Sequence, residues 1–263
     1  MNETPRQLRF GRLWVDAVTF EGALDAIDAM IDGGRGGAVF TPNVDHVVNA
    51  ETDDALVDAY GICTLSVADG MPLVWASRLL RDPLPAKISG SDLALPLAAR
   101  AASKGRRVYL IGGAGDVAVQ AAEVLRKSHG VNVVGTDSPM LGLTGGPAED
   151  AAVEKIKAAR PDLVLVAFGA PKQERFIQRA WPKVPAAVWL GIGGTFDFIA
   201  GRVRRAPPWM QRWGLEWSYR LAQEPRRLWR RYLINDPKFA IILARMLATS
   251  RADRTRVRPA RPS

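Results

Sequence analysis

Short apolar runs alternate with helical patterns along most of the chain. Six runs rich in Val, Leu, Ile and Ala, each bounded by Gly, Pro or polar residues, occupy positions 37–41, 63–68, 107–111, 131–135, 163–168 and 187–190. Continuous apolar runs of this length are typical of strands buried on both faces of a parallel sheet. Helical patterns cover 20–31, 91–103, 117–128 and 149–159. The alternation predicts an α/β fold, with a parallel sheet flanked by helices.

Polar or glycine-rich segments follow each of these runs. Because the ligand crevice of an open parallel sheet lies beyond the carboxyl ends of its strands, these segments are the first candidates for a site. In chain order they read P-N-V-D at 42–45, D-G at 69–70, G-G-A-G at 112–115, T-D at 136–137, G-A-P-K-Q-E at 169–174 and G-I-G-G-T at 191–195. We expect one crevice to collect them.

Charge is distributed unevenly along the chain. Residues 202–263 hold 16 Lys or Arg against 4 Asp or Glu, a net charge of +12. The whole chain carries +9, so residues 1–201 carry −3. The basic end also holds four of the eight tryptophans. A near-neutral α/β body with such an end indicates a catalytic domain that binds an anionic ligand near an anionic surface.

These shifts in composition predict three parts: a catalytic core at 1–201, a basic, Arg- and Trp-rich helical appendage at 202–249 and a disordered tail at 250–263. Pro225 and Pro237 are each expected to open a helix, since proline is favoured in the first turn. Helical spacing of apolar residues marks the second of these helices, at Phe239, Ile242, Leu243 and Met246. The Arg-, Pro- and Ser-rich residues from Ser250 onward are typical of a solvated tail.

Composition also argues against several classes of protein. With 263 residues, 48% of them hydrophobic, the chain can bury a sizeable core. One cysteine excludes a disulfide framework, and two histidines are too few for a Cys/His zinc site. The N-terminus lacks a signal-peptide pattern and no stretch reaches about 18 apolar residues, so we expect a cytosolic protein whose membrane contact, if any, is peripheral. The G-x-S-x-G, P-loop and D-x-D motifs are missing, which argues against a standard hydrolase, a P-loop NTPase and a metal-bound nucleotide diphosphate.

Asp69 is the candidate general base. It directly follows an apolar strand and precedes Gly70, so its carboxylate is expected to project into the crevice, partly desolvated and able to take up a proton. On local sequence alone, the alternative is an aspartate that caps a helix beginning near Met71.

Other polar groups lie at the ends of the predicted strands. Thr41 and Asn43 offer a hydroxyl and an amide after one strand, and Lys172 and Gln173 place a cation and an amide at a helix start. Both pairs suit sugar or phosphate oxygens, and both are also ordinary capping residues.

The appendage carries a cluster of arginines. Arg227, Arg230 and Arg231 share a helical face, and Arg220 lies one short segment earlier. Guanidinium groups in such a cluster can hold a diphosphate through bidentate hydrogen bonds. A solvated basic face, or general attraction to nucleic acid or acidic lipid, explains the same pattern.

Residues 113–118 support a rival function. G-A-G-D-V-A fits the dinucleotide fingerprint G-x-G-x-x-G/A between a strand and a helix, and Asp137 ends the next strand about where a ribose partner would lie. This pattern favours a nucleotide-dependent oxidoreductase, although a tight strand-to-helix turn explains it as well. A nucleic-acid-binding protein with a basic arm is a third hypothesis, which rests on charge alone.

Taken together, the motifs resemble those of the bacterial WecG/TagA/CpsF glycosyltransferases. The resemblance runs in order from about residue 10 to 245. It is carried by T-P-N at 41–43, A-D-G-M-P at 68–72, S-G-S-D at 89–92, G-A-P-K-Q-E at 169–174, G-I-G-G-T-F-D-F at 191–198, R-R-A-P at 204–207, L-E-W at 215–217 and E-P-R-R at 224–227. So many motifs in register favour this family over the local alternatives.

The resemblance implies a Rossmann-like fold with a C-terminal appendage. It also implies an inverting, metal-independent transferase without a cofactor, which moves a sugar from a UDP-sugar to a polyprenyl-diphosphate-linked saccharide in cell-surface polysaccharide or exopolysaccharide synthesis. The sugar would be N-acetylmannosamine, its uronic acid or glucose. The implied location is the inner face of the plasma membrane, where the protein would associate peripherally, with no nucleic acid as partner.

The resemblance also assigns roles to single residues. Asp69 matches the catalytic base; Thr41, Asn43 and Gln173 match residues that line the sugar-nucleotide pocket; Arg220, Arg227 and Arg230 match the arginines that close over the site and hold the diphosphate. One departure is Lys87, where the family often has arginine. Lysine keeps the positive charge but not the bidentate geometry.

Overall fold

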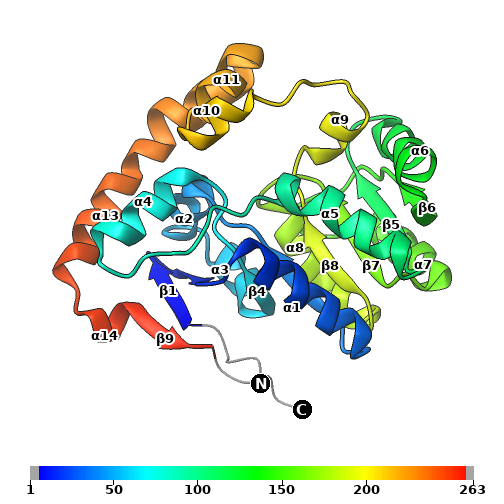
Figure 1. Ribbon diagram of the computed structural model, residues 1–263, viewed down its shortest axis with the longest axis horizontal. Coiled ribbons are helices and arrows are strands. Elements are labelled where there is room, and N and C mark those ends of the chain that lie inside the picture. Colours follow the sequence, from blue (N-terminus) through cyan, green and yellow to red (C-terminus); the bar gives the residue numbers. More distant parts are fainter. Residues whose placement is uncertain (1–5, 259–263) are drawn as a thin grey trace.

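Two β-sheets and their surrounding helices make up the computed structural model, which describes residues 6–258 (Figure 1). The strands are β1 (Arg6–Phe10), β2 (Leu13–Asp16), β3 (Gly37–Phe40), β4 (Cys63–Ser66), β5 (Arg107–Gly112), β6 (Asn132–Asp137), β7 (Leu163–Ala167), β8 (Val188–Gly191) and β9 (Thr255–Val257). The first helices are α1 (Phe20–Asp32), α2 (Val44–Ala50), α3 (Asp54–Gly61), α4 (Met71–Leu79), α5 (Gly90–Ser103), α6 (Val117–His129), α7 (Pro147–Ala159), α8 (Lys172–Ala180) and the 3₁₀ turn η1 (Trp181–Lys183). They are followed by α9 (Thr195–Ile199), α10 (Pro208–Arg212), α11 (Glu216–Gln223), α12 (Pro225–Arg230), the π-helical turn η2 (Arg231–Asn235), the 3₁₀ turn η3 (Asp236–Lys238), α13 (Phe239–Ala248) and α14 (Arg251–Arg254).

The larger sheet has six strands in the order β4-β3-β8-β7-β5-β6, and every neighbouring pair is parallel. These are the six strands that the apolar runs predict, with ends that agree to within two residues. The four predicted helices are also present, as α1, α5, α6 and α7. The prediction of a Rossmann-like α/β fold is therefore confirmed.

Alternate strand residues face opposite helical layers. In β7, Leu163 and Leu165 pack with α1, α5 and α6, whereas Val164 and Val166 pack with α7 and α8. Both faces of the sheet are therefore covered, which explains why its strands are continuous apolar runs without alternation.

The second sheet was not predicted. It is antiparallel, in the order β2-β1-β9, and β9 pairs Thr255 with Leu8 of β1. The prediction of a disordered tail was thus wrong for residues 251–258, whereas residues 259–263 lie outside the described part. The basic residues of this segment have partners that local sequence cannot reveal: Arg258 pairs with Asp16, whose side chain is fully buried, and the Arg256 guanidinium lies 4.0 Å from the centre of the Trp14 ring.

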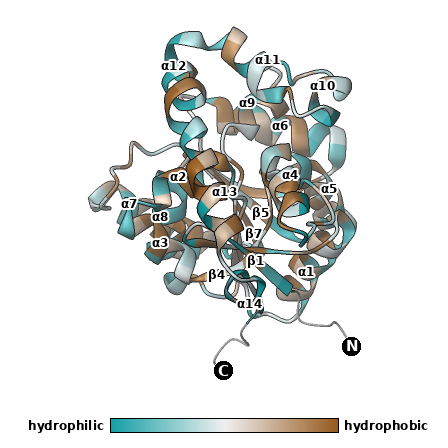
Figure 2. Ribbon diagram, turned by 90° about the vertical axis from the view of Figure 1, so that its left-hand side faces the viewer, coloured by the Kyte–Doolittle hydropathy of each residue, from teal (hydrophilic) through white to brown (hydrophobic). Residues whose placement is uncertain are grey.

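We define the arm as residues 208–238, from α10 to η3; Leu228 is the one buried residue of this segment. Proline opens α12 as predicted, but Pro237 lies in η3 and α13 begins at Phe239. The apolar stripe of α13 is buried: Phe239, Ile242 and Met246 pack with β1, β2, α2 and α4. Figure 2 shows α13 between α2 and α4. The predicted appendage at 202–249 therefore ends in a helix that belongs to the core.

Candidate functional site

A cavity of about 400 Å³ lies at the carboxyl edge of the large sheet, between the strand ends and the arm. The strand order reverses within the sheet: β4 lies outside β3 at one edge, and β6 lies outside β5 at the opposite edge. Where the strand order reverses, the loops after neighbouring strands separate and leave a ligand crevice between them. Residues after β3, β4, β7 and β8 line the cavity, and the arm supplies its remaining wall. The segments after β5 and β6 do not line it, so the expectation of one crevice for all six segments was wrong for these two.

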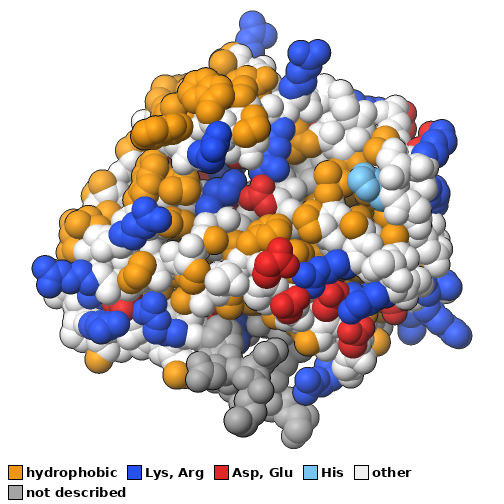
Figure 3. All heavy atoms as spheres, in the orientation of Figure 1, with side chains coloured by type: hydrophobic (Ala, Val, Ile, Leu, Met, Phe, Trp, Pro, Cys, Tyr) orange, Lys and Arg blue, Asp and Glu red, His pale blue; other side chains and the backbone are white. Residues whose placement is uncertain are grey.

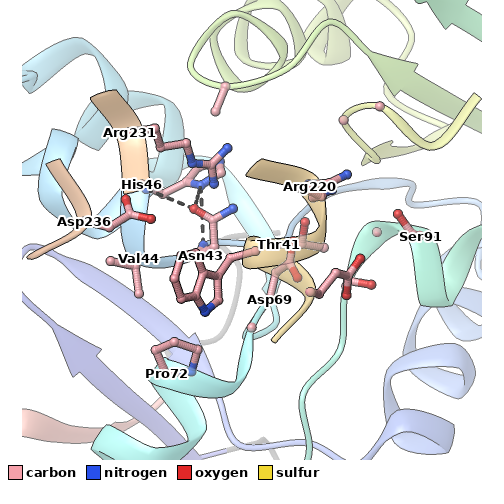
Figure 4. Close-up of a pocket in the computed structure, with 18 of the residues that line it drawn as sticks. Thr41, Asn43, Val44, His46, Asp69, Pro72, Ser91, Arg220, Arg231 and Asp236 are labelled. Carbon is pink, nitrogen blue, oxygen red and sulfur yellow. Dashed lines mark hydrogen bonds between the residues drawn. The ribbon is translucent and has the colours of Figure 1, made fainter. Parts of the chain in front are cut away.

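Asp69 lies in the wall of this cavity, three residues after β4 ends. It does not cap the following helix, since α4 has Gly70 as its N-cap and no side-chain capping bond. Gly70 has φ of +110°, which side-chain-bearing residues rarely adopt, so this sharp turn favours glycine. The local alternative for Asp69 is thus excluded, and its carboxylate faces the cavity (Figure 4).

Burial raises the pKa of Asp69 to about 6. The charges of Lys87 and Arg220 oppose this increase, whereas the carboxylates of Glu216 and Asp92 add to it. A carboxyl group with a pKa near 6 is a stronger base than an ordinary aspartate and is still mostly ionised at neutral pH. The site therefore suits Asp69 for accepting a proton from a hydroxyl group.

A cluster of four charges lies beside Asp69 and joins the body to the arm. Lys87 Nζ lies 3.0 Å from Asp92 Oδ2 and 3.8 Å from Glu216 Oε2. Arg205 also binds Asp92 and lies 3.8 Å from Glu216. Burial acts to raise the pKa of Asp92, but Lys87 and Arg205 outweigh it and lower the pKa to about 2. Lys87, which stands where the family often has arginine, therefore lies near two carboxylates, Asp92 and Glu216. The guanidinium group of Arg205 contacts the same two carboxylates.

Thr41 and Asn43 both line the cavity. Thr41 is 6% exposed, and Asn43 is the N-cap of α2, where its Oδ1 accepts a hydrogen bond from the His46 backbone N–H. The His46 Nδ1 lies 2.8 Å from the same oxygen, and its Nε2 lies 3.3 Å from Glu174 Oε1. Asn43 is therefore both a capping residue and a cavity residue, and His46 fixes its orientation.

Gln173 is buried where α8 meets the loop after β8. Its Nε2 donates to Glu174 Oε1 at 2.8 Å, and its Oε1 accepts a hydrogen bond from Gly193 N at 3.0 Å. A Cβ at Gly191 would lie 2.9 Å from Gln173 Nε2, so glycine allows this close approach. Gln173 lines the cavity, and it also holds the Gly193 loop in place.

The arm brings two of its three predicted arginines to the cavity. Arg220 and Arg227 line it, and the Arg220 guanidinium lies 5.4 Å from the centre of the Phe198 ring. Arg230 does not: its guanidinium lies against the exposed Trp229 ring. Buried Leu228 marks the inward side of α12, and Arg230 is two residues further, about 200° around the helix.

Arg231 takes the place at the cavity that was predicted for Arg230. It lines the cavity, and its Nε lies 3.5 Å from Asp45 Oδ2. His46, Glu216 and Asp236 also line the cavity, and none of them was predicted as a site residue. The sequence offers only a weak sign of their role: Glu216 lies within a family-like motif, His46 lies close after one, and Asp236 lies in none.

The dinucleotide-like segment is not part of this cavity's lining. A Cβ at Gly113 would lie 2.2 Å from Val117 Cγ1, and one at Gly112 would lie 2.7 Å from the Ala167 backbone, so tight packing explains both glycines. Asp137 is engaged by Lys155 Nζ at 2.9 Å. Within residues 6–258, no group of three His, Cys, Asp or Glu side chains is arranged to hold a metal ion.

A parallel sheet with a desolvated carboxylate and arginines around one cavity at its carboxyl edge is typical of the active site of an α/β enzyme. The sequence matches the glycosyl transferase family WecG/TagA/CpsF over residues 8–253, and the chain belongs to this family. It is thus a glycosyltransferase, with a sugar donor and an acceptor as substrates. Family membership favours this activity over the oxidoreductase and nucleic-acid-binding hypotheses.

Proposed function

We propose that the protein transfers a hexose-type sugar from a UDP-sugar to a polyprenyl-diphosphate-linked saccharide, with inversion at the anomeric carbon. The product would enter cell-surface polysaccharide or exopolysaccharide synthesis. The observation that carries the proposal is the partly buried carboxylate of Asp69, which lines one cavity together with arginines of the arm in a member of a glycosyltransferase family.

In the proposed reaction Asp69 removes the proton of the acceptor hydroxyl. The freed oxygen attacks the anomeric carbon from the face opposite the UDP, and the bond to the UDP oxygen breaks. Negative charge grows on the diphosphate as it leaves. Arg220 and Arg227, which line the cavity, stabilise that charge in this proposal, so that no metal ion is needed for it.

The surface of the arm supports a peripheral membrane location. Within residues 6–258, no helix is long and apolar enough to cross a bilayer. Exposed apolar side chains gather along the arm, with Lys and Arg among them (Figure 3). Trp209 is 54% exposed and Trp213 is 73% exposed, and Trp75 of the adjacent α4 is 47% exposed. Tryptophans with nearby cations suit the interface of an anionic membrane.

The transfer is tested by measuring UDP release. The purified protein is incubated with UDP-N-acetylmannosamine, its uronic acid or UDP-glucose, with and without a short-chain polyprenyl diphosphate that carries one sugar. We expect release from one donor that depends on the acceptor, persists in the presence of a chelator and gives a product of inverted anomeric configuration. Release that is independent of Asp69, tested with Asp69→Asn, would contradict the mechanism, and no release from any donor would contradict the transfer itself.

The membrane location is tested by sedimentation with vesicles. The protein is expected to sediment with vesicles of anionic phospholipid and much less with zwitterionic ones. Trp213→Ser should reduce sedimentation, whereas Met140→Ser, which changes an apolar residue far from the arm that is 95% exposed, should not. Equal sedimentation of both variants would contradict the role of the arm surface.

A further inference from the structure

The cavity has two ends of different chemistry (Figure 4). Asp69, Arg220 and Ser91 lie toward one end, and Asp236, Arg231 and His46 lie toward the other. The loop after β8 borders the first end, since Ser91 Oγ lies 2.9 Å from Thr195 Oγ1, and Gly193 and Gly194 of this loop line the cavity. Backbone without side chains allows close approach of a nucleotide diphosphate, so this end suits the donor. The second end lies beneath the arm, and it is available for the other substrate of the transfer, the acceptor.

Asp236 is the unexplained group of the second end. Its Oδ1 is inaccessible to solvent and has no hydrogen-bond partner among the described residues. Buried polar atoms are usually paired, and an unpaired carboxylate oxygen is unfavourable. Burial raises the pKa of Asp236 to about 6, although Arg231 opposes the increase.

Two nitrogen-bearing side chains lie near this acid. The Arg231 Nε lies 3.5 Å from Asp45, and the His46 Nε2 lies 3.3 Å from the fully buried Glu174. The charge of Arg231 lowers the pKa of Asp236, yet Asp236 Oδ1 has no hydrogen-bond partner among residues 6–258. Such a group favours a ligand that donates a hydrogen bond and disfavours one that carries a negative charge.

Apolar side chains also line the cavity. Val44 lies on the Asp236 side in Figure 4, and Leu228, Tyr232 and Phe239 belong to the same lining. Sugar rings combine hydroxyl or N–H donors with apolar C–H faces, and this end offers a partner to each.

Building on the proposed transfer reaction, we propose that Asp236 determines specificity for the acceptor, by accepting a hydrogen bond from a hydroxyl or N–H of the neutral sugar attached to the polyprenyl diphosphate. In Figure 4 Asp69 lies between Asp236 and Ser91, where it can meet an acceptor hydroxyl that approaches from the Asp236 end. A uronic acid is disfavoured as the acceptor sugar, since its carboxylate would face that of Asp236.

The test compares Asp236→Ala and Asp236→Asn with the wild-type protein. Loss of a hydrogen bond to a charged group should raise the KM for the acceptor by about tenfold to a hundredfold in the alanine variant. The asparagine variant, which keeps an acceptor oxygen, should show a smaller increase. The KM for the donor should stay within about twofold of wild type. Asp58→Asn, which removes an exposed acid outside the cavity, is the matched control.

A binding experiment without donor separates this inference from the transfer reaction. The probes are a short-chain polyprenyl diphosphate that carries one N-acetylhexosamine and the same lipid diphosphate without the sugar. We expect the wild-type protein to bind the first probe more tightly and Asp236→Ala to bind both alike. Equal discrimination by the two proteins would overturn the role of Asp236, whatever the result of the UDP assay. A purely structural Asp236 would instead lower the free energy of unfolding when replaced and leave discrimination intact.

Discussion

The two walls of the cavity are built by different means. On the sheet side, side chains are fixed by strand ends and by hydrogen bonds between loops: Asn43 caps α2 while Gln173 binds Gly193. On the arm side, Arg220 and Arg227 extend from short helices with few buried residues. The sheet side is therefore preorganised for chemistry, whereas the arm supplies charge from helices that depend on their anchors.

The anchors of the arm lie at both of its ends. Before the arm, Arg205 binds Asp92 of the body. After it, Phe239 and Met246 are buried in the core and β9 pairs with β1. A segment held at both ends can present its arginines to the cavity without a core of its own. The comparison thus predicts that sheet-side changes affect chemistry most and that arm-side changes have smaller effects.

The largest effect is expected from Asp69→Asn. Asparagine keeps the size of the side chain but cannot take up the proton, so kcat should fall by about 10² to 10⁴-fold. The KM for the donor should change little, because the base acts on the acceptor. Steady-state kinetics at pH 8, where the wild-type carboxylate is ionised, provide the measurement. A large change in donor KM with unchanged kcat would instead identify Asp69 as a donor-binding residue.

A second substitution tests the anchor behind the arm. Arg258→Ala removes the partner of Asp16, whose side chain is fully buried and also accepts a hydrogen bond from Ser66 N. Leaving a buried carboxylate unpaired should lower the free energy of unfolding by about 3 kcal/mol. Urea denaturation measures this change, with Arg35→Ala at an exposed position as control. Equal stability of the two variants would show that β9 is not an anchor.

The arm offers a matched pair of arginines. Arg227→Ala should lower kcat by about tenfold. This effect is smaller than the one expected when a buried hydrogen-bond donor to an oxyanion is removed, because Arg227 is largely exposed and solvent screens its charge. Arg230→Ala should leave kcat within about twofold, since this side chain lies against Trp229 outside the cavity. A larger loss at Arg230 than at Arg227 would contradict the orientation of α12.

Most of the fold was predictable because the large sheet is buried on both faces. Its strands are therefore apolar runs that local sequence reveals, and Asp69, Thr41 and Asn43 follow from their positions after those strands. The small sheet was not predictable, since β9 reads T-R-V and its stability comes from pairing with β1 about 250 positions earlier. Local composition does not indicate which distant segment a strand will pair with.

The arm shows the same limit at the level of single residues. Arg227, Arg230 and Arg231 share a face in an ideal helix, and only the packing of Leu228 decides which of them reach the cavity. The π-helical turn at Arg231–Asn235 then brings Asp236 to the same cavity, although no motif marks it. Wider turns of this kind depend on tertiary contacts that the sequence pattern does not encode.

The smallest effects, and the most specific ones, concern the pH dependence of activity. In the proposed mechanism the base form of Asp69 is the active one, so kcat/KM should rise with pH through the pKa of this group, near 6. Arg220 lowers that pKa, so Arg220→Ala should shift the rise to higher pH. Glu216 raises it, so Glu216→Gln should shift the rise to lower pH. Substitutions at Arg220 and Glu216, one helical turn apart, should therefore shift the pH profile of kcat/KM in opposite directions, which a general loss of arm structure cannot do.

Arg230→Ala and Glu224→Gln are the controls. They remove one positive and one negative charge elsewhere on the arm and should leave the pH profile unchanged. Shifts in the same direction for both cavity-side variants would mean that the arm does not control the charge around Asp69.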